Sequence, residues 1–316
     1  MKIIEKIEDF PELPFPVVTS GTFDGVHLGH REILQRLIEN AKHLQGQSVV
    51  ITYWPHPRLV INPNNDSLKL LSTITERKLL LAGLGVEYLL IVPFTKEFSE
   101  LSSEEYVQKI LVEAVGTKKL VIGYDHHFGK NREGNFEYLN HNAASFGFGV
   151  EEIPRQDIDQ VGISSTKIRK ALEQGKVETA ALYLGRPYSV TGKVVEGKKL
   201  GRTIGYPTAN ISVPELYKLI PAIGIYAVTC KLNNQTYGGM LSIGTNPTVG
   251  GTSVTIEVYI FDFNKDIYGH ELTIHFISWL RDEEKYDSLE ELKAQLHQDE
   301  VNAKAALANF APDTNN

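Results

Sequence analysis

Cysteine is nearly absent from this chain, which contains one, Cys230, among 316 residues. A single cysteine excludes an internal disulfide and is typical of proteins that work in a reducing cytoplasm. Cys230 falls in IYAVTCKL, where apolar and polar residues alternate, so we expect a packed thiol and not a nucleophile. The sequence therefore predicts a cytoplasmic protein whose chemistry does not use cysteine.

Long apolar runs are absent as well. No stretch approaches the roughly 20 apolar residues that a membrane-spanning helix needs. The first residues, MKIIEKIEDFPELP, carry charges throughout and have no apolar core of signal-peptide length. We expect neither a membrane segment nor a secretion signal.

Positive charge is in deficit. The chain has 32 Lys and Arg residues against 39 Asp and Glu residues, a net charge of −7. This balance argues against nucleic acid as a partner, although a local phosphate site would not show in the sum. Hydrophobic residues make up 42% of the chain, as in a globular protein, and the length favours two domains.

The first half alternates between expected strands and expected helices. Residues 16–160 contain the apolar runs PVVTSG, SVVITYW, EYLLIVPF, KKLVIGYD and GVEEIP, separated by helical patterns. Such alternation predicts a parallel sheet, whose ligands bind beyond the carboxyl ends of the strands. Three polar clusters follow strands in this way: SGTFDGVHLGH, YWPHPR and GYDHHFGKNREG.

The second half changes character near residue 185. Runs with period-two alternation, such as YSVTGKVV, GIYAVTCKL and SVTIEVYIFDF, predict antiparallel strands. The pair Asn233-Asn234 favours a hairpin, and Ser288 with Glu291 favours a capping box before a final helix. We predict an α/β domain over 1–184 and a small antiparallel β-barrel, closed by a helix, over 185–316.

The loop SGTFDGVHLGH is the first chemical candidate. A glycine-rich turn between a strand and a helix can present backbone N–H groups to an anion. The loop is neither a Walker A loop nor GxGxxG; it carries His27 and His30 as H-x-G-H at the expected helix start. Two imidazoles can donate hydrogen bonds to phosphoryl oxygens, and Gly29 would let a phosphate approach the backbone.

Other interpretations of the two histidines stay open at this point. They could form an exposed surface pair, or a zinc site completed by His56, His126 or His127. Their placement at a strand-to-helix glycine turn favours phosphate binding.

GTFDGVHLGH resembles the TGxFDxxHxGH signature of the HxGH nucleotidylyltransferases, and GISSTKIRKAL at 162–172 resembles their ISSTxIR signature. The resemblance implies a Rossmann-like fold with a parallel sheet. It also implies that His27, His30 and Arg169 are catalytic, with Arg169 countering charge on a leaving pyrophosphate. The residues it assigns to ATP phosphates are Gly21, Phe23, Asp24, His27, Gly29, His30, Ser164, Ser165, Thr166 and Arg169. An N-capped helix with a solvent-facing Arg169 is the simpler alternative.

The run GRTIGYPTANI at 201–211 is the second candidate. Thr208 and Asn210 offer neutral oxygens on one face of an extended segment, and such oxygens suit Mg²⁺. Glu257 shares a strand face with Thr255 and Tyr259, and its pattern alone indicates an ordinary exposed charge.

This run, with GIY, GTNPTV, IEVYIFDF and YGHEL downstream, resembles the riboflavin kinase module. The resemblance implies that Gly201, Gly205, Thr208 and Asn210 bind Mg-ATP, with the metal on Thr208 and Asn210. It implies that Glu257 is the general base on the 5′-hydroxyl of riboflavin.

Both signatures in this order resemble the bifunctional flavin-cofactor enzymes of bacteria. The implied reactions are riboflavin plus ATP to FMN, then FMN plus ATP to FAD and pyrophosphate, with ATP as co-substrate and Mg²⁺ as cofactor. The expected partners are therefore riboflavin, FMN, FAD and ATP, with the oligomeric state left open. The residues that the resemblance assigns to flavin are Pro57, Asp125, Phe128, Arg132, Glu257 and Arg281.

The chain departs from this family at His126, where the family usually has an aromatic residue, and at Tyr53-Trp54. Arg281 could equally be a solvated charge. Two other functions compete with the flavin enzyme: an HxGH transferase with a different phosphorylated acceptor, and a non-catalytic flavin-binding protein. The second predicts losses in the signatures, and the residues assigned to chemistry show none.

Overall fold

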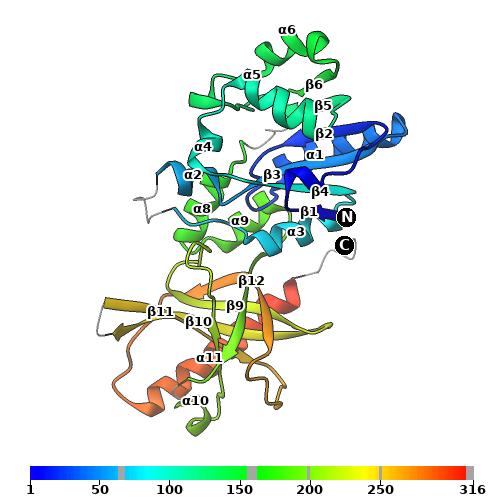
Figure 1. Ribbon diagram of the computed structural model, residues 1–316. Coiled ribbons are helices and arrows are strands. Elements are labelled where there is room, and N and C mark those ends of the chain that lie inside the picture. Colours follow the sequence, from blue (N-terminus) through cyan, green and yellow to red (C-terminus); the bar gives the residue numbers. More distant parts are fainter. Residues whose placement is uncertain (63–67, 155–161, 198–199, 249–250, 311–316) are drawn as a thin grey trace. The chain divides into compact units, whose positions relative to one another are not determined.

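The computed structural model describes all residues except 63–67, 155–161, 198–199, 249–250 and 311–316. The chain divides into two compact units, Met1–Ser165 and Thr166–Asn316 (Figure 1). We describe each unit by itself. In the described part of the chain, no helix has both the length and the apolarity to cross a membrane.

A six-stranded sheet forms the centre of the first unit, in the order β1-β4-β3-β2-β5-β6. Every neighbouring pair in it is parallel, which confirms the predicted α/β fold. The edge strand β1 is not expected from its sequence, because it is three residues long and charged at its start. The strands are β1 (Lys2–Ile4), β2 (Pro16–Ser20), β3 (Gln47–Trp54), β4 (Tyr88–Pro93), β5 (Lys119–Gly123) and β6 (Gly149–Ile153).

Helices connect these strands. Two capping boxes form both of their hydrogen bonds, at Thr73 with Glu76 before α3 and at Ser102 with Glu105 before α5. The short helix α5 runs directly into the π-helix η2. The helical segments are η1 (Ile7–Asp9), α1 (Leu28–His43), α2 (Pro57–Ile61), α3 (Ile74–Gly83), α4 (Lys96–Ser99), α5 (Ser103–Tyr106), η2 (Val107–Ala114), η3 (Lys130–Arg132) and α6 (Phe136–Phe146).

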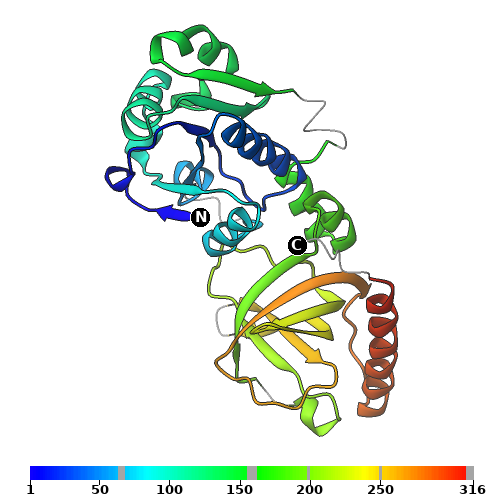
Figure 2. The same ribbon diagram turned by 90° about the vertical axis from the view of Figure 1, so that its right-hand side faces the viewer.

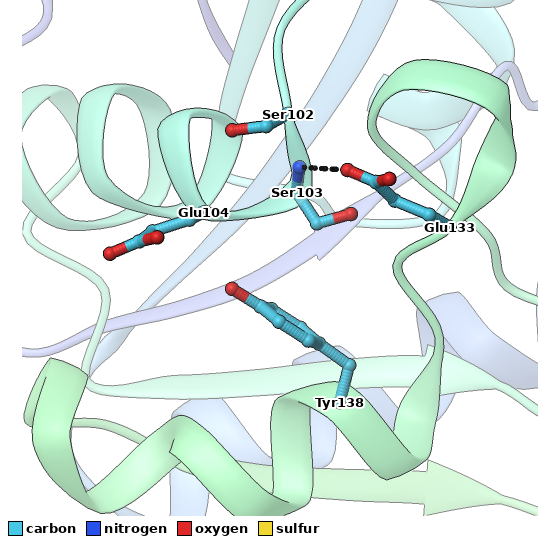
Figure 3. Close-up of a pocket in the computed structure, with 5 residues that line it drawn as sticks. All are labelled: Ser102, Ser103, Glu104, Glu133 and Tyr138. Atoms are coloured by element: carbon cyan, nitrogen blue, oxygen red, sulfur yellow. Dashed lines mark hydrogen bonds between the residues drawn. The ribbon is translucent and has the colours of Figure 1, made fainter.

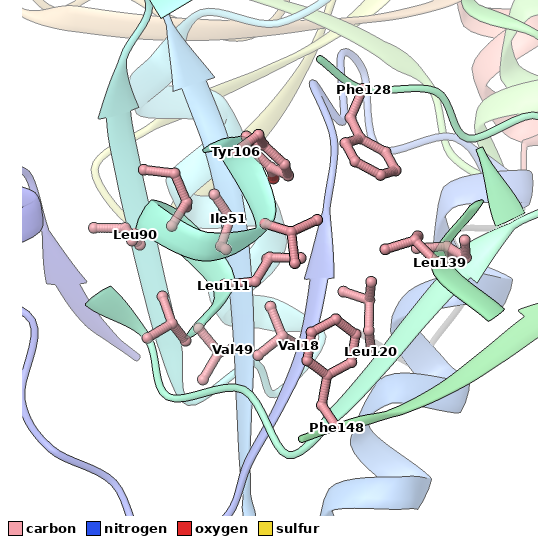
Figure 4. Close-up of a cluster of buried hydrophobic side chains, with 14 of the residues drawn as sticks. Val18, Val49, Ile51, Leu90, Tyr106, Leu111, Leu120, Phe128, Leu139 and Phe148 are labelled. Atoms are coloured by element: carbon pink, nitrogen blue, oxygen red, sulfur yellow. The ribbon is translucent and has the colours of Figure 1, made fainter. Parts of the chain in front are cut away.

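Apolar clusters cover both faces of the sheet. Val18 and Leu120 belong to a cluster with Leu111 of η2 and Leu139 of α6 (Figure 4). Their neighbour Val17 belongs to a second cluster, with residues of α1 and α3. Burial on both faces explains why the strand sequences are nearly continuous apolar runs.

The strand order changes direction at β2. β3 and β4 follow it on one side of the sheet, and β5 and β6 lie on the other. In open α/β sheets this switch point is where ligands bind, outside the carboxyl ends of the strands. The H-x-G-H loop leaves β2 at this point, and GYDHHFGKNREG leaves the neighbouring β5.

The second unit begins with two helices and contains a closed antiparallel barrel in the order β10-β11-β8-β7-β12-β9. This confirms the predicted barrel. The elements are α8 (Ser165–Glu173, whose first residue belongs to the first unit), α9 (Val177–Leu184), β7 (Tyr188–Val195), α10 (Leu200–Thr203), β8 (Ala209–Ser212), β9 (Gly224–Leu232), β10 (Gln235–Thr248), β11 (Gly251–Ile260), β12 (Glu271–Arg281) and α11 (Leu289–Asn309).

The helix α11 lies along the barrel, as predicted (Figure 2). Ala303 and Leu307 of this helix pack against Met240 and Phe261. Ser288 caps the helix by accepting from the Glu291 amide, but the Glu291 carboxylate accepts from Asp287, so only half of the expected box forms. The hairpin between β9 and β10 turns at Asn233, with φ of 50°.

Cys230 lies in the interior of the barrel with no exposed surface. Burial raises the pKa of its thiol to about 12, so the thiolate is not populated at neutral pH. The prediction of a packed, unreactive thiol is confirmed.

Candidate active sites

The loop between β2 and α1 holds an unusual backbone conformation. Phe23, Gly25 and Val26 have φ values of 46°, 79° and 41°, in the left-handed region. Two of these residues are not glycine, and one is β-branched, so the conformation is strained. Strain of this kind persists where the surrounding structure enforces it, most often at functional sites.

His27 caps helix α1. Its Nδ1 accepts a hydrogen bond of 3.3 Å from the amide of His30, which leaves the proton of a neutral ring on Nε2. The two imidazole rings stack, with centroids 3.6 Å apart and planes inclined by 15°. The H-x-G-H spacing therefore produces one paired group and not two independent histidines.

Burial lowers the pKa of His30 well below its usual value, and the charges of His27 and Arg77 lower it further. The ring is neutral at physiological pH. Phe23 packs edge-on against it, with centroids 5.3 Å apart. In the described part of the chain, the buried Nδ1 of His30 has no hydrogen-bond partner.

Asp24 fastens this loop to the protein. Its buried carboxylate accepts bonds of 3.0 Å from the amides of Leu71 and Ser72, and one of 3.2 Å from the Ser72 hydroxyl. The Ser72 hydroxyl also accepts from the amide of Gly25. The negative charge of this carboxylate would repel a phosphate, and its oxygens already accept hydrogen bonds. We therefore expect Asp24 to hold the shape of the loop and not to contact phosphate directly.

A hydrogen bond joins the second signature to the first. The hydroxyl of Ser165, the first residue of α8, donates to the backbone oxygen of Asp24 over 3.1 Å. Ser164 precedes the helix, and Thr166 is exposed. Arg169 is buried, with 8% of its surface exposed, so the alternative of a solvent-facing arginine is wrong.

Arg77 lies outside both motifs. It is fully buried in α3, and its Nη1 donates to the Thr52 hydroxyl over 3.3 Å, which in turn donates to the backbone oxygen of Thr22. It thus places a cation behind the loop. The sequence offers one indication that Arg77 is buried: it lies four residues before Leu81, on the apolar face of the same helix.

The alternative of a zinc site finds no support. Among the described residues, no three His, Cys, Asp or Glu side chains come together as a group that could hold a metal ion. His56 is instead the N-cap of α2, where its Nδ1 accepts from the amide of Arg58.

The loop after β5 holds three of the candidate flavin residues, Asp125, Phe128 and Arg132. Phe128 is buried against the rings of Tyr106, His126 and Tyr138, with centroids 5.3, 5.8 and 6.1 Å away. Asp125 and Arg132 are exposed on the same loop, and Pro57, at the start of α2, is partly buried.

His126 connects this loop to β2. Its Nε2 lies 3.4 Å from the hydroxyl of Ser20, the last residue before the H-x-G-H loop. Burial lowers the pKa of His126 to about 4, with smaller contributions from His127 and Arg132. The imidazole is therefore a neutral, ring-shaped replacement for the usual aromatic residue.

In the barrel, the GRTIGYPTAN run makes a tight turn before β8. The amide of Tyr206 donates to the oxygen of Gly201 over 2.8 Å, and Gly205 has φ of 89°. A side chain on Gly201 would collide with the backbone oxygen of Tyr206. The glycines thus allow the turn that delivers Thr208 to the barrel wall.

Thr208, Asn210 and Glu257 come together. The Thr208 hydroxyl donates to Oε2 of Glu257 over 3.0 Å, and Asn210 stands opposite Glu257 in the β8–β11 ladder. A Cβ on Gly197 would lie 2.1 Å from the Asn210 amide nitrogen, so any larger residue there would displace the Asn210 side chain. Glu257 is half-buried and bonded, so the pattern-based interpretation as an ordinary exposed charge is wrong.

Arg281 forms an ion pair and is not a solvated, unpaired charge. Its Nε and Nη2 donate to the two carboxylate oxygens of Asp299 over 2.8 and 2.7 Å, and its Nη1 donates to the Asp282 oxygen. Asp299 is buried in α11, so this bidentate pair ties the end of β12 to the last helix.

Comparison with known proteins gives the same two parts. A family model described as FAD synthetase matches residues 11–167, and one described as riboflavin kinase matches residues 184–307. The chain is 41% identical to the bifunctional riboflavin kinase/FMN adenylyltransferase of Listeria monocytogenes, over 92% of each chain. It is 36% identical to the Escherichia coli K12 protein of the same name, over 96% of this chain and 97% of that protein.

Among solved structures, one described as a macrolide-efflux protein from Streptococcus pneumoniae matches with a TM-score of 0.88. It is 34% identical, and the match covers 98% of this chain and 99% of that one. With similarity along both parts, the chain belongs to the family of bifunctional riboflavin kinase/FMN adenylyltransferases.

Proposed function

We propose that this chain phosphorylates riboflavin to FMN and then adenylylates FMN to FAD, with ATP as the donor in both steps. Relatives with both activities in their name match more than nine-tenths of the chain. The observation that carries the kinase assignment is the bond between Thr208 and Glu257. We place the boundary between the two activities at 184/185.

In the kinase step, Glu257 is the general base. It takes the proton of the 5′-hydroxyl of riboflavin as that oxygen attacks the γ-phosphorus of ATP and ADP leaves. The Thr208 hydroxyl orients the carboxylate, and the turn at Gly201 and Gly205 accommodates the nucleotide.

The oxygens of Thr208 and Asn210 fit a magnesium ion. Because the Thr208 proton points to Glu257, the lone pairs of its oxygen remain for a cation, and hard neutral oxygens are what Mg²⁺ accepts beside phosphate. When bound, the ion would neutralise charge on the phosphates.

In the adenylyl step, a phosphate oxygen of FMN attacks the α-phosphorus of ATP and pyrophosphate leaves, without a covalent enzyme intermediate. His27, from Nε2, and His30, stacked beside it, both donate to the charge that develops on the α-phosphate. Arg169 counters the charge of the leaving pyrophosphate.

The remaining phosphate-binding candidates have the following roles in this proposal. Asp24 fixes the loop by its bonds to the 71–72 segment. Gly21, Phe23, Gly29, Ser164, Ser165 and Thr166 hold the ATP phosphates.

For the flavin of the adenylyl step, Phe128 offers a ring face, and Pro57, Asp125 and Arg132 contact the remaining parts of FMN. In the kinase step, Glu257 touches the ribityl hydroxyl. Arg281 has donor hydrogens beyond those bonded to Asp299 and Asp282 with which to reach flavin. We propose that the protein works in the cytoplasm, where its substrates are made and its thiol stays reduced.

The decisive experiment incubates the purified protein with riboflavin, ATP and Mg²⁺ and separates the products by chromatography. Formation of FMN followed by FAD is expected. If neither product forms, the proposal fails. If FMN accumulates and supplied FMN gives no FAD, the first part of the chain uses another phosphorylated acceptor.

A further inference from the structure

The loop that carries Phe128 and Arg132 lacks regular structure for most of its length. A single bridge closes it, with the amides of Phe128 and Gly134 donating to each other's backbone oxygens over 3.1 and 3.0 Å. Inside, Gly129, Asn131 and Arg132 have φ values of 74°, 54° and 61°. Because two of these left-handed residues are not glycine, the loop needs outside contacts to keep this shape.

Those contacts come from the start of α5. The Oε1 of Glu133 accepts a hydrogen bond of 3.1 Å from the amide of Ser103 (Figure 3). The amide of Lys130 donates to the oxygen of Leu101 over 2.7 Å, and its ammonium pairs with Glu100. The loop is thus docked on the residues that begin the helix.

The fit at this contact is close. A Cβ on Gly129 or Gly134 would lie 2.5 or 2.7 Å from the hydroxyl oxygen of Ser103, which is buried. Both glycines therefore let the loop backbone rest directly on Ser103. A pocket of about 380 Å³ opens beside the contact, lined by Ser102, Ser103, Glu104, Glu133 and Tyr138.

We propose that Glu133 is a positioning residue for FMN in the adenylyl step: its bond to the Ser103 amide holds the 128–134 loop in the shape that presents Phe128 and Arg132. This rests on the proposed adenylyltransferase function. Glu133 itself touches no substrate. Its loss therefore weakens the binding of FMN and leaves both the binding of ATP and the kinase step unchanged.

The test compares Glu133→Ala, Glu133→Gln and Glu104→Ala in the full-length protein. Glu104 is the matched control, because it is a second exposed carboxylate on the same pocket and its side chain makes no hydrogen bond among the described residues. The steady-state rate of FAD formation is measured over a range of FMN concentrations and over a range of ATP concentrations, which gives a KM for each substrate. The rate of FMN formation from riboflavin is measured with the same protein samples.

We expect Glu133→Ala to raise the KM for FMN about 5- to 10-fold, the scale of one typical lost hydrogen bond. The KM for ATP and the rate of FMN formation stay within about 2-fold, and Glu133→Gln, which keeps an acceptor oxygen, recovers most of the effect. Glu104→Ala behaves like the unmodified chain.

An unchanged KM for FMN in Glu133→Ala would overturn the proposal. So would a rise in the KM for FMN and ATP alike, or a Gln variant no better than Ala, because either result indicates a general structural role. If the unmodified chain makes no FAD from FMN, the failure lies with the proposed function and not with this inference.

Discussion

The hydroxyl of Thr208 lies 3.0 Å from Oε2 of Glu257, 49 positions further along the chain. One residue comes from the turn that precedes β8 and the other from the middle of β11. The hydrogen bond links Thr208, the candidate magnesium ligand, directly to Glu257, the candidate general base.

Replacing Glu257 with glutamine should abolish FMN formation and spare the conversion of supplied FMN to FAD. Glutamine keeps the size of the side chain and an oxygen for Thr208 to reach, but it cannot take a proton. Both products are quantified by chromatography, with riboflavin or FMN as the starting flavin.

Glu271→Gln is the matched control, because Glu271 is an exposed carboxylate in the same barrel, on β12. It should leave both activities unchanged. Loss of both activities in a folded Glu257→Gln protein would contradict the independence of the two sites.

Thr208→Val should weaken the use of Mg-ATP by the kinase about 10- to 100-fold, the range seen when a metal site loses an orienting partner. Valine keeps the branched shape but has no oxygen for the cation and no proton for Glu257. Thr208→Ser, which retains the hydroxyl, should keep most of the activity. The rate of FMN formation is measured over a range of Mg²⁺ concentrations. Equal rates in the Val and Ser variants would show that the Thr208 hydroxyl has no role in the kinase reaction.

His30→Ala should leave FMN formation unchanged and lower FAD formation by about 10²-fold or more, the effect of removing a donor that stabilises a transition state. The imidazole is buried, stacked and neutral, so no neighbouring side chain replaces it. The measurement is the single-turnover rate of FAD formation with saturating ATP and FMN. An unchanged rate would refute a catalytic role for His30.

The two roles of His27 can be separated. His27→Asn retains a capping oxygen for α1, whereas His27→Ala does not, so only the alanine variant should lose about 1 kcal/mol of stability. Both variants lack the Nε2 donor, and both should lose FAD formation. Thermal unfolding and FAD formation are measured on the same samples; normal FAD formation in the Asn variant would assign His27 to capping alone.

His126 makes stability depend on pH. Its folded pKa of about 4 lies below the usual 6.5, so between these values the unfolded chain binds a proton that the folded protein does not. Stability is therefore lost as pH falls below 6.5, and this contribution is about 1 kcal/mol at pH 5 after allowance for partial exposure of the ring.

His126→Phe should remove this loss and keep the ring against Phe128. The fall in the midpoint of thermal unfolding between pH 7.5 and pH 5 should be smaller than in the unmodified chain. The control is His141→Phe, at an exposed position of α6. An equal pH dependence in the His126 and His141 variants would contradict the buried, neutral state of His126.

The fold could largely be predicted from the sequence. The runs 16–21, 48–54, 87–94, 118–125 and 149–154 predict strands, and the helical spacing between them predicts a parallel sheet. The period-two runs after 185 predict an antiparallel barrel in the same way. Two elements escaped this reasoning. The strand β1 has too few residues for a pattern, and η2 differs from an α-helix in hydrogen bonding and not in composition.

Long-range partners could not be predicted. A motif places His27, His30 and Asp24 on one loop. The sequence does not show that the Asp24 carboxylate accepts hydrogen bonds from residues 71–72, or that Arg77 is buried. Arg281 was expected at a flavin, and its bond to Asp299 depends on how α11 docks on the barrel.

The sequence by itself determined the two kinds of domain, their order and the residue types available to each site, because periodicity and motif spacing are local properties of a chain. Only the tertiary structure decided which groups are bonded, buried or neutral. The stacking of His27 on His30, the hydrogen bond from Thr208 to Glu257 and the docking of Glu133 on Ser103 depend on packing. Burial and hydrogen bonding arise between segments that are distant in sequence, and a pattern within one segment does not contain them.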